Sequence, residues 1–105
     1  MKKDVFWGVR RKMKHSNISL DEYLLLLREK GFKFEEDVIG FIYFGKQYTK
    51  ASDQTIKAAI EITLKTQKHF DGSFYMSLLE TFQNKNIESM KQAYTYVQQL
   101  GLLPA

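Results

Sequence analysis

Two capping boxes near the ends of the sequence predict where helices begin. In each box a serine is followed three residues later by Glu or Gln: Ser19 by Glu22, and Ser89 by Gln92. The serine hydroxyl accepts the N–H of the third residue, whose side chain accepts the N–H of the serine. Apolar residues recur at helical spacing after both boxes, and the 105-residue chain has a single proline. The sequence therefore predicts an all-α fold.

Three further helical segments are predicted between these boxes. They begin near Glu35, at Ser52 or Asp53, and near Ser73, and the last of them runs to about Asn84. Apolar residues recur every three or four positions, which places them on one face of a helix. Together with the two capped helices, these segments predict a compact bundle of about five helices.

Residues 38–44 are apolar on nearly every side, and two structures fit them. Their β-branched and aromatic residues, flanked by glycine, are consistent with a short buried strand. The acidic residues 35–37 just before them favour a helix, because carboxylates suit the positive end of a helix dipole. We favour a helix, central in the core. We expect Gly40 to permit a close helix crossing, and Gly45 to mark the end of the helix or a kink.

The helix that begins at Ser52 or Asp53 is expected to be amphipathic. Its apolar positions are Ile56, Ala59, Ile60, Thr63 and Leu64, and the side chains expected to face water are Lys57, Glu61, Lys65 and Lys68. We expect His69 in its last turn, where a cation suits the dipole. The last helix is expected to turn Met90, Ala93, Tyr94, Val97 and Leu100 inward.

The net charge of +4 is concentrated at the start of the chain. Residues 1–15 hold six Lys or Arg and one Asp, a net +5, whereas residues 16–105 hold ten basic and eleven acidic side chains, a net −1. We therefore divide the chain into a basic, aromatic arm or short helix at residues 1–17 and a single helical domain at residues 18–105.

Three interpretations of the arm remain open. Its cations can bind the phosphates of single-stranded DNA while Trp7 stacks on a base, or they can lie on an anionic membrane with Phe6 and Trp7 inserted. The arm can equally pack its apolar side on the body, which we favour because no nucleic-acid motif accompanies it. The candidate nucleic-acid-binding residues are Lys2, Lys3, Trp7, Arg10, Arg11, Lys12 and Lys14.

The residue types that carry most enzyme chemistry are scarce. There is no cysteine, and the two histidines, His15 and His69, lie far apart in the sequence. We find no nucleophile paired with a base and no glycine-rich phosphate loop. We therefore expect no catalytic residue, metal, cofactor or small-molecule substrate. No apolar run approaches the length of a membrane span, so we expect a cytoplasmic protein without a transmembrane segment.

A ridge of large apolar residues at intervals of four precedes the second capping box. The ridge and the positions after it are Phe74, Leu78, Phe82, Asn86, Ile87, Ser89 and Ala93. With the helix before it, this arrangement over residues 55–99 resembles the C-terminal domain of the DnaD-type primosome proteins of Gram-positive bacteria and their phages. The resemblance implies a helical hairpin followed by a capped last helix. It also implies that the motif positions Phe74, Leu78, Phe82, Ile87, Ser89 and Ala93 belong to the core.

The sequence departs from that family in ways that bear on DNA binding. Phe74 and Phe82 stand where the family has Tyr and Trp, so the ridge lacks their polar O–H and N–H groups. We expect neither the winged-helix domain nor the DNA-binding tail that the family usually has. Residues 71–105 carry a net charge of −1, which does not suit a phosphate-binding surface. The resemblance therefore supports the fold more than DNA binding.

The function expected from these observations is that of a small non-catalytic interaction module. We expect it to act in a Gram-positive bacterium or phage, in a process related to replication. Its partner would be an unidentified protein or a second copy of itself. Single-stranded DNA binding through residues 1–15 is the alternative, and binding to an anionic membrane surface is a further one.

Overall fold

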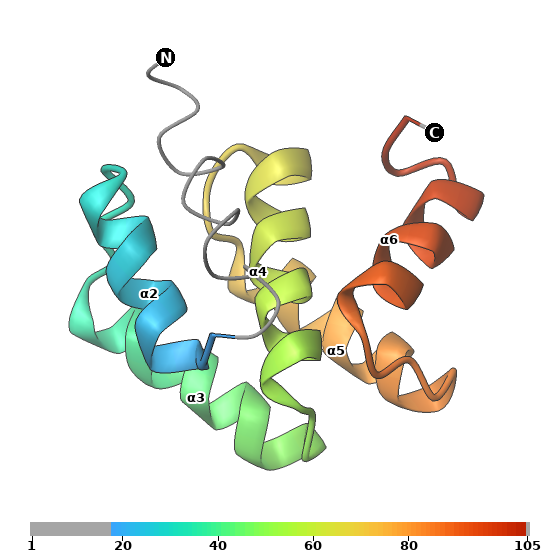
Figure 1. Ribbon diagram of the computed structural model, residues 1–105, viewed down its shortest axis with the longest axis horizontal. Coiled ribbons are helices and arrows are strands. Elements are labelled where there is room, and N and C mark those ends of the chain that lie inside the picture. The colour runs from blue at the N-terminus through green and yellow to red at the C-terminus, as the bar shows by residue number, and fades with distance from the viewer. Residues whose placement is uncertain (1–17, 105) are drawn as a thin grey trace.

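Helix α4, Asp53–Gln67, forms the centre of the fold (Figure 1). The computed structural model describes residues 18–104, where the other helices are α2, Leu20–Glu29; α3, Glu36–Thr49; α5, Gly72–Asn84; and α6, Met90–Gln99. Each of these four helices contacts α4, with α2 and α3 on one side of it and α6 on the other. Residues 18–104 contain no strand. The prediction of an all-α bundle of about five helices is confirmed.

Of the five helices in residues 18–104, all but α3 begin at a side-chain cap, and the sequence predicts most of these caps. The Ser19 hydroxyl accepts from the N–H of Glu22, and the Ser19 N–H donates to the Glu22 carboxylate, both at 3.2 Å. Ser89 caps α6 in the same way, but the Gln92 side chain accepts from Glu88, one residue before the predicted donor, at 2.9 Å. The remaining side-chain caps are Ser52 for α4 and Asp71 for α5.

Three helices end in the same motif, in which the chain turns back through a residue of positive φ. Two backbone N–H groups beyond the helix then satisfy carbonyl groups of its last turn, which is the Schellman arrangement. The positive-φ residues are Gly31 after α2, Asn86 after α5 and Gly101 after α6. The longer bonds of the motif run from Phe32 to Leu27, from Ile87 to Phe82 and from Leu102 to Val97, at 2.9, 2.9 and 3.0 Å. Two of the three are glycine, the residue most often found at this position because it adopts positive φ without a steric penalty.

Neither glycine of α3 has the role predicted for it. Gly45 does not end the helix, which continues to Thr49; instead it lies where α3 crosses α5. A Cβ atom at Gly45 would lie 2.8 Å from Leu79 Cδ1 and 2.9 Å from Tyr75 Cε2, so the crossing requires glycine. The Tyr75 hydroxyl also donates to the carbonyl of Ile42 at 2.8 Å. A Cβ atom at Gly40 would meet nothing within 4 Å.

Residues 38–44 are helical, as favoured, but α3 is not the central helix. Its buried residues are Ile42, Gly45 and Thr49, whereas Phe44 and Tyr48 are 55% and 62% exposed. The small and β-branched residues of α4 let four helices approach its axis, which the large aromatic side chains of α3 do not. Of the residues on α4, every one from Thr55 to Ile60 is buried.

The face of α4 expected to be solvated is partly internal. Lys57 has no exposed surface, and Glu61 is half-buried between Tyr23 of α2 and Tyr94 of α6. The expectation for these two positions is wrong because α2 and α6 flank α4 and residues of both cover this face. Two smaller expectations also fail, since His69 follows the end of α4 and Leu100 is 54% exposed.

Candidate functional site

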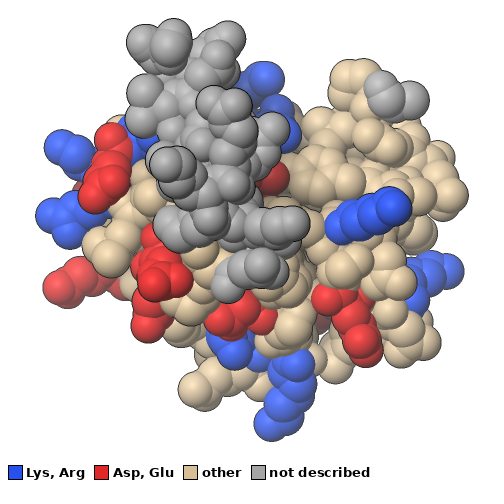
Figure 2. All heavy atoms as spheres, viewed as in Figure 1, with Lys and Arg blue, Asp and Glu red and all other residues tan. Residues whose placement is uncertain are grey.

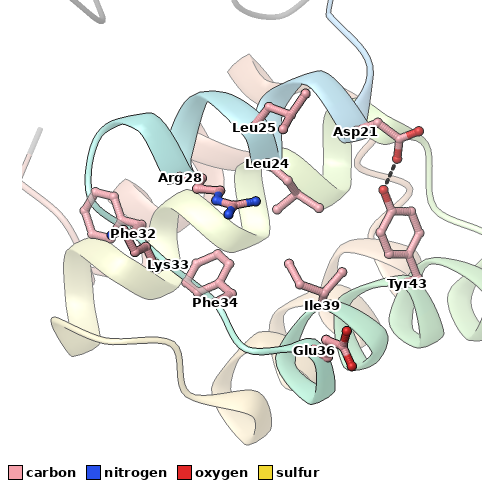
Figure 3. A pocket seen from close by; sticks show the side chains of 10 residues that line it. All are labelled: Asp21, Leu24, Leu25, Arg28, Phe32, Lys33, Phe34, Glu36, Ile39 and Tyr43. Carbon is pink, nitrogen blue, oxygen red and sulfur yellow. Dashed lines mark hydrogen bonds between the residues drawn. The ribbon is translucent and has the colours of Figure 1, made fainter.

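An apolar groove opens between α2 and α3 (Figure 3). It has a volume of about 470 Å³, within the size range of protein sites that receive ligands or partner side chains. Its lining residues are Asp21, Leu24, Leu25, Arg28, Phe32, Lys33, Phe34, Glu36, Ile39 and Tyr43. They come from the two helices and from the linker between them.

The walls of the groove are aliphatic and aromatic. Leu24 and Ile39 approach each other across the space between the helices (Figure 3). Leu25 is 58% exposed and Phe32 is 44% exposed. Residues 24–27 are four successive leucines, more than one face of α2 can bury, so Leu27 enters the core and Leu25 remains at the surface. The groove therefore presents apolar surface to solvent.

The linker side of the groove is held by an aromatic chain that reaches the core. The Phe34 ring lies 5.8 Å from the Phe70 ring, and the Phe70 ring lies 5.1 Å from that of Tyr75, in tilted arrangements favourable for aromatic pairs. Tyr75 is fully buried, and Phe34 is half-buried. The position of the linker is thus set by packing, and the groove exists without a ligand.

A hydrogen bond joins the two walls at the end of the groove opposite the linker. The Tyr43 hydroxyl of α3 donates to the Asp21 carboxylate of α2 (Figure 3). Partial burial, with this bond and the charge of Asp21, raises the pKa of Tyr43 to about 12. The phenol is therefore neutral near pH 7 and remains a donor. Toward the linker end the lining holds Arg28 and Lys33 against Glu36, so that end has a net positive charge.

The groove offers apolar contact and little chemistry. Its lining includes no Ser, Thr, Cys or His that could serve as a nucleophile or an imidazole base. In residues 18–104, no group of three or more His, Cys, Asp or Glu side chains is placed to hold a metal ion. The arrangement suits binding of an apolar surface.

A second polar cluster lies inside the bundle around α4. The Glu61 carboxylate accepts hydrogen bonds from the hydroxyls of Tyr94 and, at 3.4 Å, Tyr23. Burial, with the negative charge of Glu61, raises the pKa of both tyrosines. Lys57 donates to the backbone carbonyl of Ile18. Burial lowers its pKa, against the opposing effect of nearby carboxylates. The Glu61 hydrogen bonds join α4 to α2 and α6, and the Lys57 hydrogen bond joins α4 to the residue before the Ser19 cap, so we assign these groups a structural role.

Asp53 connects the starts of two helices to the end of a third. Its carboxylate accepts the backbone N–H of Leu20 at 3.0 Å and forms a salt bridge with Lys46 at 3.3 Å. Although burial alone would raise the pKa of Asp53, the Leu20 hydrogen bond and Lys46 together lower it. Asp53 therefore ties α2, α3 and α4 together in its ionised form.

Comparison with known proteins identifies a family but no activity. The profile of one family, described as a family of unknown function (DUF6123), matches residues 14–103. The chain belongs to this family. Neither the curated proteins nor the solved structures gave a match. In the described residues of this DUF6123 protein, no helix combines the length and the apolar character needed to cross a membrane.

The candidate residues of the arm and of the DnaD-like motif lie in different parts of this DUF6123 chain. Lys2, Lys3, Trp7, Arg10, Arg11, Lys12 and Lys14 are outside residues 18–104, and of these only Lys14 falls within the range matched by the family. The motif residues Leu78, Phe82 and Ala93 are buried, Phe74 and Ile87 are half-buried against the core, and Ser89 caps α6. The structure brings the motif residues together and places the groove elsewhere.

Sequence reasoning did not identify the groove. A signal for it was present in residues 24–27, because a run of four leucines gives a helix an apolar face wider than its contact with the core. The exposed aromatic residues of α3, Phe44 and Tyr48, were missed because their helix was expected to be central. Both features concern apolar residues that the fold leaves at its surface.

Proposed function

We propose that this DUF6123 protein is a non-catalytic helical module that binds a partner protein through the groove between α2 and α3. The observation that carries the proposal is the open apolar groove of about 470 Å³ with Leu25 and Phe32 exposed in its wall. Apolar grooves between helices are common peptide-binding sites.

The occupant that fits this groove is an amphipathic helix of the partner. Such a helix inserts apolar side chains from positions i, i+3 or i+4, and i+7, which match a groove walled by Leu24, Leu25 and Ile39. Arg28 and Lys33 at the linker end favour an acidic residue at the corresponding end of the partner helix. The proposed ligand is therefore a leucine-rich, acidic amphipathic segment.

The charge distribution of the body also favours a protein partner over nucleic acid. Residues 16–105 carry a net charge of −1. On the face shown in Figure 2, basic and acidic side chains are interspersed rather than gathered by sign. The alternative of single-stranded DNA binding therefore depends on residues 1–15 alone. The resemblance of residues 55–99 to DnaD-type proteins makes replication of a Gram-positive bacterium or phage the process in which we propose that the module acts.

A photo-crosslinking amino acid tests the groove directly. We expect a chain carrying it in place of Leu25 to form a crosslink to one defined protein in its native cell. We expect the same residue in place of Leu100, which is also exposed but lies at the end of α6, to give no such product. The crosslinked segment of the partner should be an acidic amphipathic helix. Equal crosslinking from both positions, or none from position 25, would contradict the proposal.

A substitution in the groove tests binding, and the same substitution outside the groove is the matched control. We expect Leu25→Glu to abolish binding of a synthetic peptide made from the crosslinked segment, without lowering the thermal midpoint, because the side chain is more than half exposed. Leu100→Glu should leave binding unchanged. If both variants bind the peptide as the unsubstituted chain does, the groove is not the site.

A further inference from the structure

The outer face of α3 carries an aromatic strip that packs on α5 at its first ring, Phe41, whose centroid lies 6.1 Å from that of Tyr75. Phe41, Phe44 and Tyr48 follow one another at intervals of three and four, so they lie on one side of the helix. Ring centroids are 6.3 Å apart for Phe41 and Phe44 and 5.7 Å apart for Phe44 and Tyr48, and both pairs are stacked. Phe44 and Tyr48 are more than half exposed.

Gly40 adds a gap to the same face, one turn before Phe44. A Cβ atom there would meet no other atom within 4 Å, so the packing of this chain does not require glycine at that position. Glycine in the middle of a helix is destabilising relative to alanine. A glycine beside an exposed phenylalanine is the pattern expected where another helix approaches closely and inserts a ring.

The charges along the helix make this face complementary to itself. Asp37, four residues before Phe41, lies on this face at the acidic start of α3, and the exposed Lys50 follows the last turn of the helix. Two copies of α3 packed antiparallel bring the acidic start of each helix to the basic end of the other, with opposed helix dipoles. A phosphate backbone would meet the Asp37 carboxylate at the start of this face, which disfavours nucleic acid as the occupant.

We propose that the outer face of α3 is a self-association surface, occupied by α3 of a second copy of this chain in antiparallel orientation. With the two-fold axis on the outer side of α3, at the level of Ile42 along the helix, Gly40 of one copy receives Phe44 of the other. Asp37 then lies opposite Gln47 of the second copy, with Lys50 about one turn beyond. The groove residues Ile39 and Tyr43 lie on a different side of α3, so a dimer formed in this way leaves the partner groove open.

The interface is small, which sets the expected affinity. α3 has 14 residues, and an interface dominated by one pair of such helices lies near or below the ~1,200 Å² at which stable complexes begin. We therefore expect reversible association, detectable by sedimentation as protein concentration rises to about 200 µM. A chain that remains monomeric over this range would overturn the proposal.

Substitutions at Gly40 and Phe44 separate association from folding. We expect Phe44→Glu to prevent association without loss of helical circular dichroism, because the ring is exposed. Gly40→Leu should fill the gap, weakening association about tenfold or more while raising the thermal midpoint of the dilute protein. Leu25→Glu, in the groove, should associate as the unsubstituted chain does. If Phe44→Glu associates normally, the face is not an interface between copies.

A charge exchange tests the antiparallel orientation. We expect Asp37→Lys and Lys50→Glu to weaken association separately, since each places like charges opposite each other in a dimer of identical chains. A mixture of the two variants restores opposite charges at both ends, so it should form mixed dimers. If a mixture of the two variants associates no better than either variant alone, the antiparallel pairing is excluded. Peptide binding in the groove is measured with dilute monomer. A failure to self-associate therefore does not affect the test of the proposed groove function.

Discussion

Alanine substitution at the two glycines of α3 is predicted to have opposite effects on stability. At Gly45, an added Cβ lies 2.8 Å from Leu79 Cδ1, 2.9 Å from Tyr75 Cε2 and 3.1 Å from the Tyr75 hydroxyl. At Gly40, it meets nothing within 4 Å. The same chemical change in the same helix therefore isolates the close crossing of α3 and α5 from helix propensity.

The magnitude at Gly45 follows from two opposing contributions. Carbon atoms in van der Waals contact lie ~3.5–4.0 Å apart, so the new methyl group would overlap two side chains. Tyr75 and Leu79 are 0% and 1% exposed, so neither can move toward solvent. Overpacking of this kind costs about 1–3 kcal/mol, against a gain of about 1 kcal/mol in helix propensity. We expect Gly45→Ala to lower the free energy of unfolding by up to about 2 kcal/mol, which places it about 1–3 kcal/mol below Gly40→Ala.

Urea unfolding followed by circular dichroism at 222 nm measures this effect. Gly40→Ala is the matched control, and we expect it to raise the free energy of unfolding by about 0.5–1 kcal/mol. A change of 1 kcal/mol moves the thermal midpoint of a domain of this size by roughly 4–8 °C, so the two variants should be well resolved. Dilute protein keeps self-association out of the measurement. If Gly45→Ala is as stable as Gly40→Ala, the crossing is not as close as we describe.

Two further predictions concern the core and the ionised contacts of α4. Phe82→Ala should lower the free energy of unfolding by about 3–5 kcal/mol, because the ring has no exposed surface, and a much smaller loss in urea unfolding would be inconsistent with its core position. Asp53→Asn should lower the urea midpoint at pH 7 and reduce its decrease in acid. The pKa of Asp53 is lowered in the folded protein, so its contribution is complete above the unfolded value and is lost as the pH falls through the folded value. An unchanged acid profile in this variant would show that the Leu20 hydrogen bond and the Lys46 salt bridge do not stabilise the fold.

The helix boundaries could be predicted from the sequence because they depend on local chemistry. A serine three residues before Glu or Gln, as at Ser19 and Ser89, can form its bonds within a single turn of backbone. A glycine after the last turn, as at Gly31 and Gly101, can adopt the positive φ that ends a helix. These signals act within a few residues and need no information about the rest of the fold.

The environment of each helix could not be predicted in the same way. Lys57 and Glu61 were placed on a solvated face because their own helix has an opposite apolar face. Their burial depends on how α2 and α6 pack against α4, which the sequence of α4 alone does not determine. The close helix crossing was assigned to Gly40 instead of Gly45 for the same reason, since only the path of α5 distinguishes the two glycines.

The candidate groove depends on the arrangement of two helices and was not predictable from either alone. Leu25 is exposed and Leu27 is buried although both belong to the same run of leucines, because α4 lies on one side of α2 and the groove on the other. The nucleic-acid hypothesis for the arm lies outside residues 18–104 and remains a prediction. The sequence could indicate only that the chain has more apolar residues than one core can bury.

The distribution of apolar residues around α3 connects the fold to both proposed surfaces. A helix that is apolar nearly all round normally lies in the core, yet α3 lies at the edge of the bundle. One side, with Ile42 and Gly45, packs on the other helices, and a second side, with Ile39 and Tyr43, lines the groove. The third, with Phe44, is exposed. If only the first side were needed, polar residues on the other two would cost the fold nothing and would reduce aggregation. The apolar character of α3 beyond its core contact is therefore best explained by binding, to a partner helix on one side and to a second copy on the other.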